Sequence, residues 1–347
     1  MQTFKKFVCS ILVTVLTFVL ISAVVTKPYM ASEAKYYQDS RLRAELAGEI
    51  DCLMLGSSHG LAALDTGVVD AELGYNSYNI SSVRMTMDSK YWMLEKELSR
   101  NPVRFVILEV AYDSLARNED EEVAEGDQVM VSRLDDFSER AQYLFRHVTL
   151  DRWLDIYSLV FIDALTYCVD SLLGRAESKV DYAAKGFLRR ETRDVTWPAA
   201  DAREVYHSES VPTYYPPENL QRLDEMMALC KSYGCRVLVV VTPVSDAALW
   251  MRSDWDHFHN WMTQYCEKQQ CEFYDFNLLL DRYSLFHDQT SFYDLHHMCA
   301  DGATVFTGAL CDVVQKVDAG EDTAKYFYRS YEEMKLDSPY MQFLPQT

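Results

Sequence analysis

Residues 52–60 are Cys-Leu-Met-Leu-Gly-Ser-Ser-His-Gly, a short apolar run that passes into small residues. The apolar run predicts a buried strand over Cys52–Leu55, and the small residues predict a tight turn into a helix over Ser58–Leu73. The alternation continues in segments that we predict as a strand over Tyr75–Ile80, a helix over Met85–Leu98 and a strand over Arg104–Val110. Strands that alternate with helices across short joints are typical of a parallel sheet with helices on both faces.

The alternation lapses over residues 113–217, which we interpret as a mostly helical insertion with helices around 138–148 and 154–173. It then resumes in elements that we predict as a helix over Leu220–Tyr233, a strand over Arg236–Val241, a helix over Trp255–Lys268, a strand over Glu272–Phe276 and a closing helix over Ala303–Val314. The sequence therefore predicts a three-layer α/β/α sandwich with a mainly parallel sheet over residues 48–315. Residues 316–347 would form a C-terminal extension.

The N-terminal segment differs from the rest of the chain. Phe7–Val25 is a 19-residue stretch without a charge, a proline or a glycine, and two lysines precede it. A helix needs about 20 apolar residues to cross a bilayer, and the lysines favour a cytoplasmic N-terminus. We expect a signal anchor or transmembrane helix over residues 1–27, a stalk over 28–47 and an extracytoplasmic main domain. A cleaved secretory signal is the alternative, and it leaves the compartment of the main domain unchanged.

Composition and charge limit the partners of the chain. Of its 347 residues 49% are hydrophobic, which suffices for a sizeable core, and the formal net charge is −20. This charge would repel phosphates, so we exclude nucleic acid as a partner. Of the nine cysteines, two pairs, Cys230/Cys235 and Cys266/Cys271, share the same spacing. Each pair could close a small loop as a disulfide in an oxidising compartment or remain as free, buried thiols.

Three residues from the two ends of the predicted domain could form a catalytic group. Ser58 follows the first strand, at the sheet edge where parallel α/β folds bind ligands. Asp294 precedes His297 by three residues, a separation that can bring the carboxylate to one imidazole nitrogen and leave the other for a serine. Ser58, His297 and Asp294 are therefore the candidate nucleophile, base and orienting carboxylate. Each residue also has a structural alternative, since serine and aspartate are common helix caps.

Two further features bear on the chemistry. Asn79 and Ser81 follow the second predicted strand, and with Ser58 they are candidate members of an oxyanion hole. A rival arrangement is a zinc site, for which the candidate ligands are His257, His259, His287, Asp288, His296 and His297. His257 and His259 stand at a predicted helix start, where residues two apart face different directions. We therefore predict neither a metal nor another cofactor.

With these motifs placed, the chain resembles the SGNH (GDSL-like) hydrolase superfamily. The resemblance rests on Gly56-Ser57-Ser58 after the first strand and on Asp294-Leu-His-His297 followed by Gly302-Ala303. It is strongest to a membrane-anchored, extracytoplasmic branch related to the D-alanyl-lipoteichoic acid protein DltD and to polysaccharide O-acetyltransferase-like proteins. The chain departs from the superfamily at residues 79–82, where a glycine is usual, and at residues 108–111, where a Gly-x-Asn-Asp block is usual.

The resemblance implies a serine esterase or O-acyltransferase that acts on acyl esters of cell-wall or exported polysaccharide. An acylated glycan is then the expected substrate, and the membrane is reached through residues 7–25. A second hypothesis is a catalytically inactive module that binds glycan or docks on a polytopic membrane O-acyltransferase. The missing asparagines, in the absent Gly-x-Asn-Asp block and at Cys299 where the superfamily usually has Asn, favour the second hypothesis, whereas the intact Ser58, Asp294 and His297 favour the first.

Overall fold

The structure is a computed structural model of the chain. It describes residues 10, 13, 17, 20–22, 24–27, 29, 35–117, 123–134, 137–175, 181–191, 204 and 206–343. The described chain divides into two compact units. One comprises residues 1–42 and 127–179, and the other comprises residues 43–126 and 180–347.

The second unit is built on a five-stranded sheet in which every strand pair is parallel. Its strand order is β2-β1-β3-β7-β9. The strands are β1 (Cys52–Leu55), β2 (Ser77–Asn79), β3 (Phe105–Glu109), β7 (Arg236–Val241) and β9 (Glu272–Asp275). This is the doubly wound order in which the chain starts near one edge, steps outward once and then crosses to the other edge. The predicted parallel α/β fold is confirmed.

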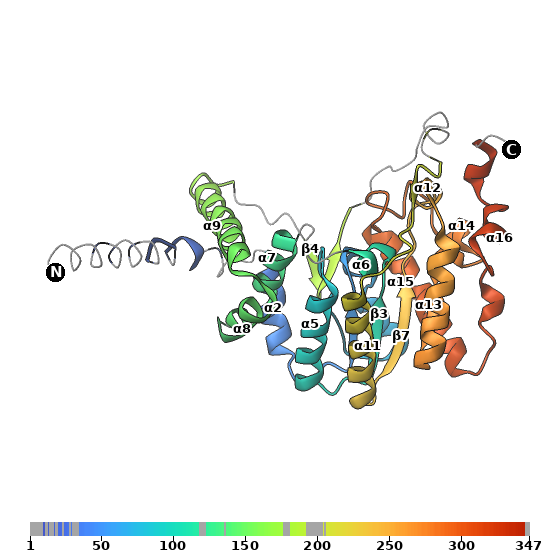
Figure 1. Ribbon diagram of the computed structural model, residues 1–347, viewed down its shortest axis with the longest axis horizontal. Helices are drawn as coiled ribbons and strands as arrows, with labels where there is room; N and C mark the ends of the chain where they lie inside the picture. Colours follow the sequence, from blue (N-terminus) through green and yellow to red (C-terminus); the bar gives the residue numbers. More distant parts are fainter. Residues whose placement is uncertain are drawn as a thin grey trace. The chain divides into compact units, whose positions relative to one another are not determined.

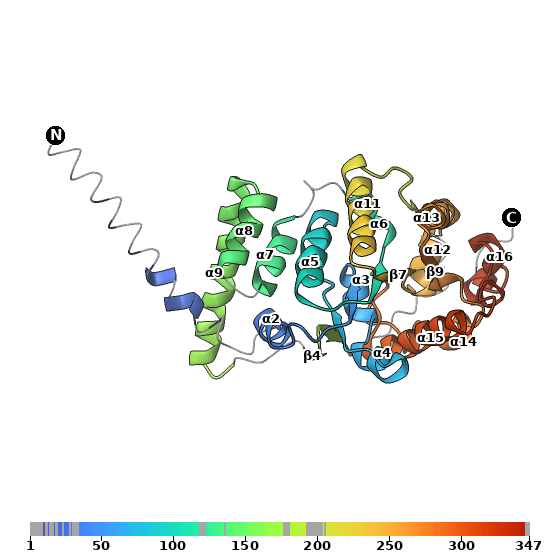
Figure 2. The same cartoon turned by 90° about the horizontal axis from the view of Figure 1, so that it is seen from below.

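Helices cover both faces of the sheet, as the end-on view in Figure 2 shows. On one face lie α3 (Ser58–Ala63), α4 (Thr66–Leu73) and α15 (Ala300–Asp318), which contact one another. On the other face lie α5 (Met87–Arg100), α11 (Pro217–Ser232) and α13 (Trp255–Gln269). Met54, Ile107 and Leu238 from the strands pack with Phe306 and Leu310 of α15 in one buried apolar cluster. This cluster fixes α15, and with it the loop just before α15, against the sheet.

The segment after β1 differs from the predicted single helix over Ser58–Leu73. Helix α3 ends at Ala63, and α4 starts at Thr66 because the Asp65 carboxylate caps it by accepting the Gly67 N–H at 2.9 Å. Gly74, at φ 71°, ends α4 in the left-handed conformation that glycine adopts without strain. Because of this break, α3 is a short helix that directly follows the turn after β1.

The remaining elements of the second unit are shorter, and β4, α6, α12, α14 and α16 among them are labelled in Figure 1. They are α6 (Tyr112–Ala116), β4 (Asp181–Ala184), β5 (Phe187–Arg189), β6 (Glu209–Ser210), α12 (Asp246–Met251), β8 (Arg252–Ser253), η1 (Phe276–Leu278), α14 (Arg282–Leu285), η2 (Ala324–Tyr326), α16 (Tyr331–Lys335) and η3 (Pro339–Phe343). β4 and β5 form an antiparallel pair, and β6 pairs with β8.

The first unit is helical. Its helices α8 (Phe137–His147) and α9 (Leu150–Leu172) agree with those predicted inside the insertion. The residues of helices α2 (Lys35–Glu45) and α7 (Val123–Arg133) are divided between the two units. Residues 127–179 of the predicted insertion thus group with the N-terminal residues, whereas residues 180–217 group with the sheet.

Among the described residues, no helix is both long enough and apolar enough to cross a membrane. Most of residues 7–25 lies outside the described part of the chain, so the predicted anchor stays a prediction. The two cysteine pairs of the second unit carry free thiols, and burial raises the pKa of Cys230 to about 12.

Candidate active site

The nucleophile candidate lies on the turn between β1 and α3. Ser57 caps α3, and its Oγ accepts the His59 N–H at 3.2 Å. Ser58 is the first residue of the helix, and its side chain is half-buried at the carboxyl edge of the sheet. Gly56 and Ser57 supply the small residues that let the chain turn sharply from strand to helix. The Ser58 hydroxyl therefore projects from the point where a doubly wound sheet binds its ligands.

The structure brings Ser58, His297 and Asp294 together. His297 Nε2 lies 2.8 Å from Ser58 Oγ. His297 Nδ1 lies 2.9 Å from both Oδ1 and Oδ2 of Asp294. The imidazole thus bridges a hydroxyl and a carboxylate through its two nitrogens, although 239 positions separate the serine from the histidine. In this arrangement a hydroxyl can lose its proton to an imidazole that a carboxylate holds in place.

Asp294 fixes the turn that carries His297. Its Oδ1 accepts the backbone N–H groups of His296 and His297, each at 2.9 Å. Burial raises the pKa of Asp294, but the hydrogen bond and charge of His297 outweigh burial, and the net pKa lies below the usual value. Arg190 adds positive charge, with Nη1 3.9 Å from Oδ2 of this carboxylate. Asp294 is therefore ionised at neutral pH, as an orienting group must be.

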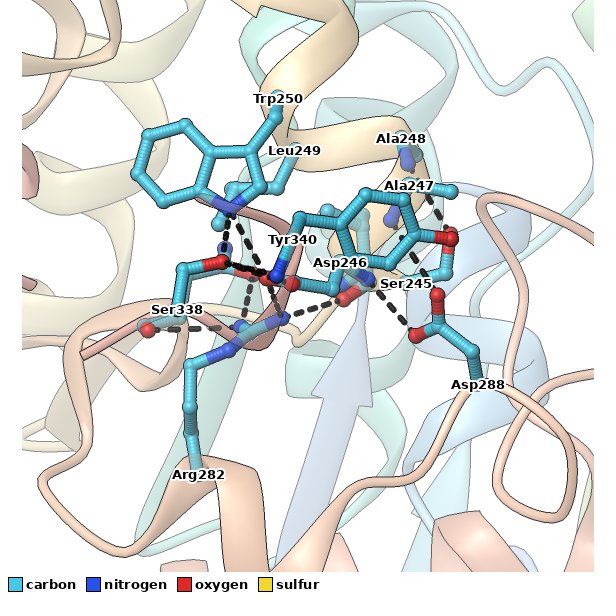
Figure 3. A network of polar contacts seen from close by, with 12 residues as sticks. Ser245, Asp246, Ala247, Ala248, Leu249, Trp250, Arg282, Asp288, Ser338 and Tyr340 are labelled. Atoms are coloured by element: carbon cyan, nitrogen blue, oxygen red, sulfur yellow. Dashed lines mark hydrogen bonds and ion pairs between the residues drawn. The ribbon is translucent and has the colours of Figure 1, made fainter. Parts of the chain in front are cut away.

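A buried polar network supports the same turn from the side of α12 (Figure 3). The Ser245 N–H donates to the Leu295 carbonyl at 3.1 Å, which ties the turn to the residue that caps α12. Behind it, Asp288 accepts the N–H groups of Asp246 at 2.8 Å and Ala247 at 3.2 Å. Trp250 and Ser338 both donate to the Asp246 carboxylate. These hydrogen bonds therefore hold in place the loop that carries His297.

Two neighbouring histidines are uncharged at neutral pH. The His59 ring meets the His297 ring edge-on at 5.1 Å and stacks on the His296 ring at 6.3 Å. Burial, and then the proximity of His297, lowers the pKa of His59 to about 4. Burial, and then His59, lowers the pKa of His296 to about 4. The sequence interpretation missed His59, although its position directly after Ser58 places it at the site.

In the structure, the groups of Asn79 and Ser81 that were expected to donate to an oxyanion donate to other groups of the protein. The Asn79 side-chain amide donates to the carbonyls of Gly60 and Leu64, each at 3.0 Å. Its Oδ1 accepts the Ser81 N–H at 3.0 Å, so that donor is also in use. Asn79 is fully buried and pins both ends of α3 to β2. Of the three candidates, the backbone N–H of Ser58 remains, in the first turn of a helix, where N–H groups lack intrahelical acceptors.

The rival histidines are not assembled into a metal site. His259 Nδ1 faces Asp275 Oδ2 at 3.4 Å, beside β9. Across the described ranges, no three His, Cys, Asp or Glu side chains are placed to hold one metal ion.

No protein-family model matches the chain, and no curated protein matches it. Among solved structures, it is similar to one named as an acylhydrolase from Bacteroides fragilis, with 8% identity, a TM-score of 0.38 and coverage of 82% of this chain and 98% of that one. A GDSL-like lipase from Bacteroides thetaiotaomicron has 8% identity, a TM-score of 0.37 and the same coverage. A structure named as a platelet activating factor from Streptococcus pneumonia has 12% identity and a TM-score of 0.37, and covers 87% of this chain and 98% of that one. These values are too low to carry an argument about function, which rests on the site itself.

Proposed function

We propose that this chain is a serine esterase or O-acyltransferase of the SGNH hydrolase type. The observation that carries the proposal is the hydrogen-bonded chain from Ser58 Oγ through His297 to Asp294, at 2.8 and 2.9 Å. Each residue stands at hydrogen-bond distance from the next before any substrate binds. A helix-capping role alone does not require His297 to face Ser58.

In the proposed reaction, Ser58 Oγ attacks the carbonyl carbon of an ester while His297 Nε2 takes the hydroxyl proton. Asp294 keeps the imidazole in the required tautomer and stabilises the imidazolium. The Ser58 N–H, at the start of α3, donates to the developing oxyanion. His297 then returns the proton to the leaving alcohol, and an acyl-serine remains. Water or a second hydroxyl attacks this ester and releases the acyl group as an acid or as a new ester.

The substrate and location are part of the same proposal. We infer an acyl ester of a cell-wall or exported polysaccharide outside the cytoplasm, with the chain held at the membrane through residues 7–25. The sequence of that segment and the resemblance to the membrane-anchored branch support this inference. The same two observations support a polytopic membrane O-acyltransferase as the partner that supplies the acyl group.

Hydrolysis of p-nitrophenyl acetate by the purified full chain tests the reaction. We expect Ser58→Ala and His297→Gln to lower turnover by about 10³- to 10⁶-fold, to the background rate. His259→Gln serves as the matched control, because His259 faces Asp275 and not the site. Equal activity in all four proteins would contradict the proposal.

A second candidate function is supported by the fate of Asn79. Its amide and the Ser81 N–H are committed to internal hydrogen bonds, so the oxyanion hole holds fewer donors than expected. A site of this kind fits a non-catalytic module that binds acylated glycan. In that case the wild type would bind acetylated oligosaccharide, and Ser58→Ala would bind it equally well without any turnover in either protein.

A further inference from the structure

The last residue of β3, Glu109, lies directly beneath the turn that carries Ser58. Its side chain is 0% exposed. Glu109 Oε2 accepts the Ser57 N–H at 2.6 Å and the Ser57 hydroxyl at 2.9 Å. The fit is close, since a Cβ built on Gly56 would lie 2.4 Å from Oε2 and one on Gly60 would lie 3.1 Å from the Glu109 Cβ. The two glycines of the turn therefore leave room for this one carboxyl group.

The hydrogen bonds show which form of Glu109 fits this place. Oε2 accepts two hydrogen bonds, so a proton would have to sit on Oε1. Within the described part of the chain, Oε1 is buried without a hydrogen-bond partner, and a hydroxyl there would be an unsatisfied donor. Lys90 of α5 is likewise 0% exposed, and its charge lowers the pKa of Glu109 against the rise that burial causes. Within the described part of the chain its Nζ has no hydrogen-bond partner, so Lys90 acts on Glu109 through its charge and not through a direct hydrogen bond.

We infer that Glu109 is a positioning residue for the reaction of Ser58, acting through Ser57. By holding the Ser57 N–H and hydroxyl, the carboxylate sets the direction in which α3 starts. That direction decides where Ser58 Oγ meets His297 and where the Ser58 N–H points. This inference rests on the proposed function and adds a residue that the superfamily motifs of the sequence do not contain.

Because Glu109 holds Ser57 in its ionised form, activity depends on the protonation of Glu109 as well as on that of His297. Burial raises the pKa of Glu109, while Lys90 and the Ser57 hydrogen bonds oppose the rise. The charge of Asp113 of α6 raises the pKa of both Glu109 and Lys90, and the charges of His59 and Arg117 lower the pKa of Asp113. When Glu109 takes up a proton on acidification, the hold on Ser57 weakens and Lys90 loses its countercharge. Activity should then fall for a reason separate from the protonation of His297.

The test compares the full-length wild type with Glu109→Gln and with the double variant Glu109→Gln/Lys90→Met, which removes both charges and keeps an acceptor oxygen. The control is Glu97→Gln, which removes another buried carboxylate, one that pairs with Arg43 away from the site. The first measurement is the rate of fluorophosphonate labelling between pH 5 and 8. The second is amide hydrogen exchange in the peptide over residues 55–61, which does not depend on activity.

We expect both Glu109 variants to label about 10- to 100-fold more slowly at neutral pH, as small displacements of reacting groups do. The ratio of variant to wild-type rate should rise toward one as pH falls, because the wild type then loses the same charge. Exchange over residues 55–61 should increase in both variants and stay unchanged in Glu97→Gln. Labelling rates in the Glu109 variants that equal the wild-type rate at every pH, or unchanged exchange, would overturn the inference.

The two proposals fail separately in this design. If the wild type is not labelled but exchange over residues 55–61 rises in the Glu109 variants, the hold on Ser57 stands and the proposed function falls. If labelling occurs and the Glu109 variants match the wild type at every pH, the proposed function stands and the positioning role falls.

Discussion

Replacing Gly56 by alanine should damage both the stability and the active site of this protein, for one geometrical reason. A Cβ at this position would lie 2.4 Å from Oε2 and 2.7 Å from Cβ of Glu109. Both residues are buried, so neither can swing into solvent. The added methyl group must push the β1–α3 turn away from β3 or force the carboxyl group off its rotamer.

The size of the effect follows from the cost of overpacking. Inserting one methyl into a filled interior costs about 1–3 kcal/mol, and the 2.4 Å contact places this site toward the upper end of that range. Gly308 in α15 is the matched control, since a Cβ there has no neighbour within 4 Å. Gly308→Ala should stabilise the protein by about 1 kcal/mol, because alanine is the better helix former.

The assay is urea unfolding of Gly56→Ala, Glu109→Gly and the double variant, because glycine removes both Oε2 and the Cβ that the added methyl group would meet. If the clash with Glu109 is the cause, Gly56→Ala should cost at least about 1 kcal/mol less in the Glu109→Gly background than in the wild type. Additive effects, within about 0.5 kcal/mol, would refute this reasoning. The labelling rate of Ser58 provides a second readout, and it should fall in Gly56→Ala but not in Gly308→Ala.

Three other changes test separate parts of the structure. Asn79→Ala removes the amide donor to the carbonyls of Gly60 and Leu64, of which Gly60 still accepts the Leu64 N–H, so urea unfolding should show a loss of about 1–3 kcal/mol; an unchanged stability would contradict the assigned role. Asp294→Asn should lower esterase turnover by about 10⁴-fold while near-ultraviolet circular dichroism stays unchanged, and a variant that keeps its turnover would exclude Asp294 as the orienting group. Burial raises the pKa of Asp246 to about 6, so the folded state binds this proton more tightly than the unfolded state. Stability should therefore fall by up to about 3 kcal/mol between pH 4 and 6 and stay level above, and this dependence should be absent in Asp246→Asn.

The sequence was sufficient to predict those elements and residues whose structure depends on the local residue pattern. Cys52–Leu55 and Arg236–Val241 are continuous apolar runs of strand length, and both strands have these bounds in the structure. Asp294 and His297 were found because their interaction is local. The serine was found because a small-residue turn after a buried strand marks the ligand-binding edge of such a sheet.

What the sequence did not predict depends on contacts between distant segments. Asn79 was expected at an oxyanion hole because it ends a strand, but the two carbonyls that take up its amide belong to α3. Glu109 went unassigned because its partner Ser57 lies 52 positions earlier. Asp65 caps α4 and so divides the predicted helix in two. The apolar residues on either side of it follow one helical periodicity, which gave no sign of a break. Contacts with distant segments thus decide the roles of Asn79 and Glu109, whereas Asp65 acts on a residue two positions away.

The most direct test of the account is to label the full-length protein with a fluorophosphonate probe and to map the modified residue by peptide mass spectrometry. The account predicts one adduct, on Ser58, that is lost in Ser58→Ala and strongly reduced in His297→Gln. Absence of the adduct from the folded wild type, or an adduct on another serine that persists in Ser58→Ala, would contradict the claim that Ser58 is an activated nucleophile.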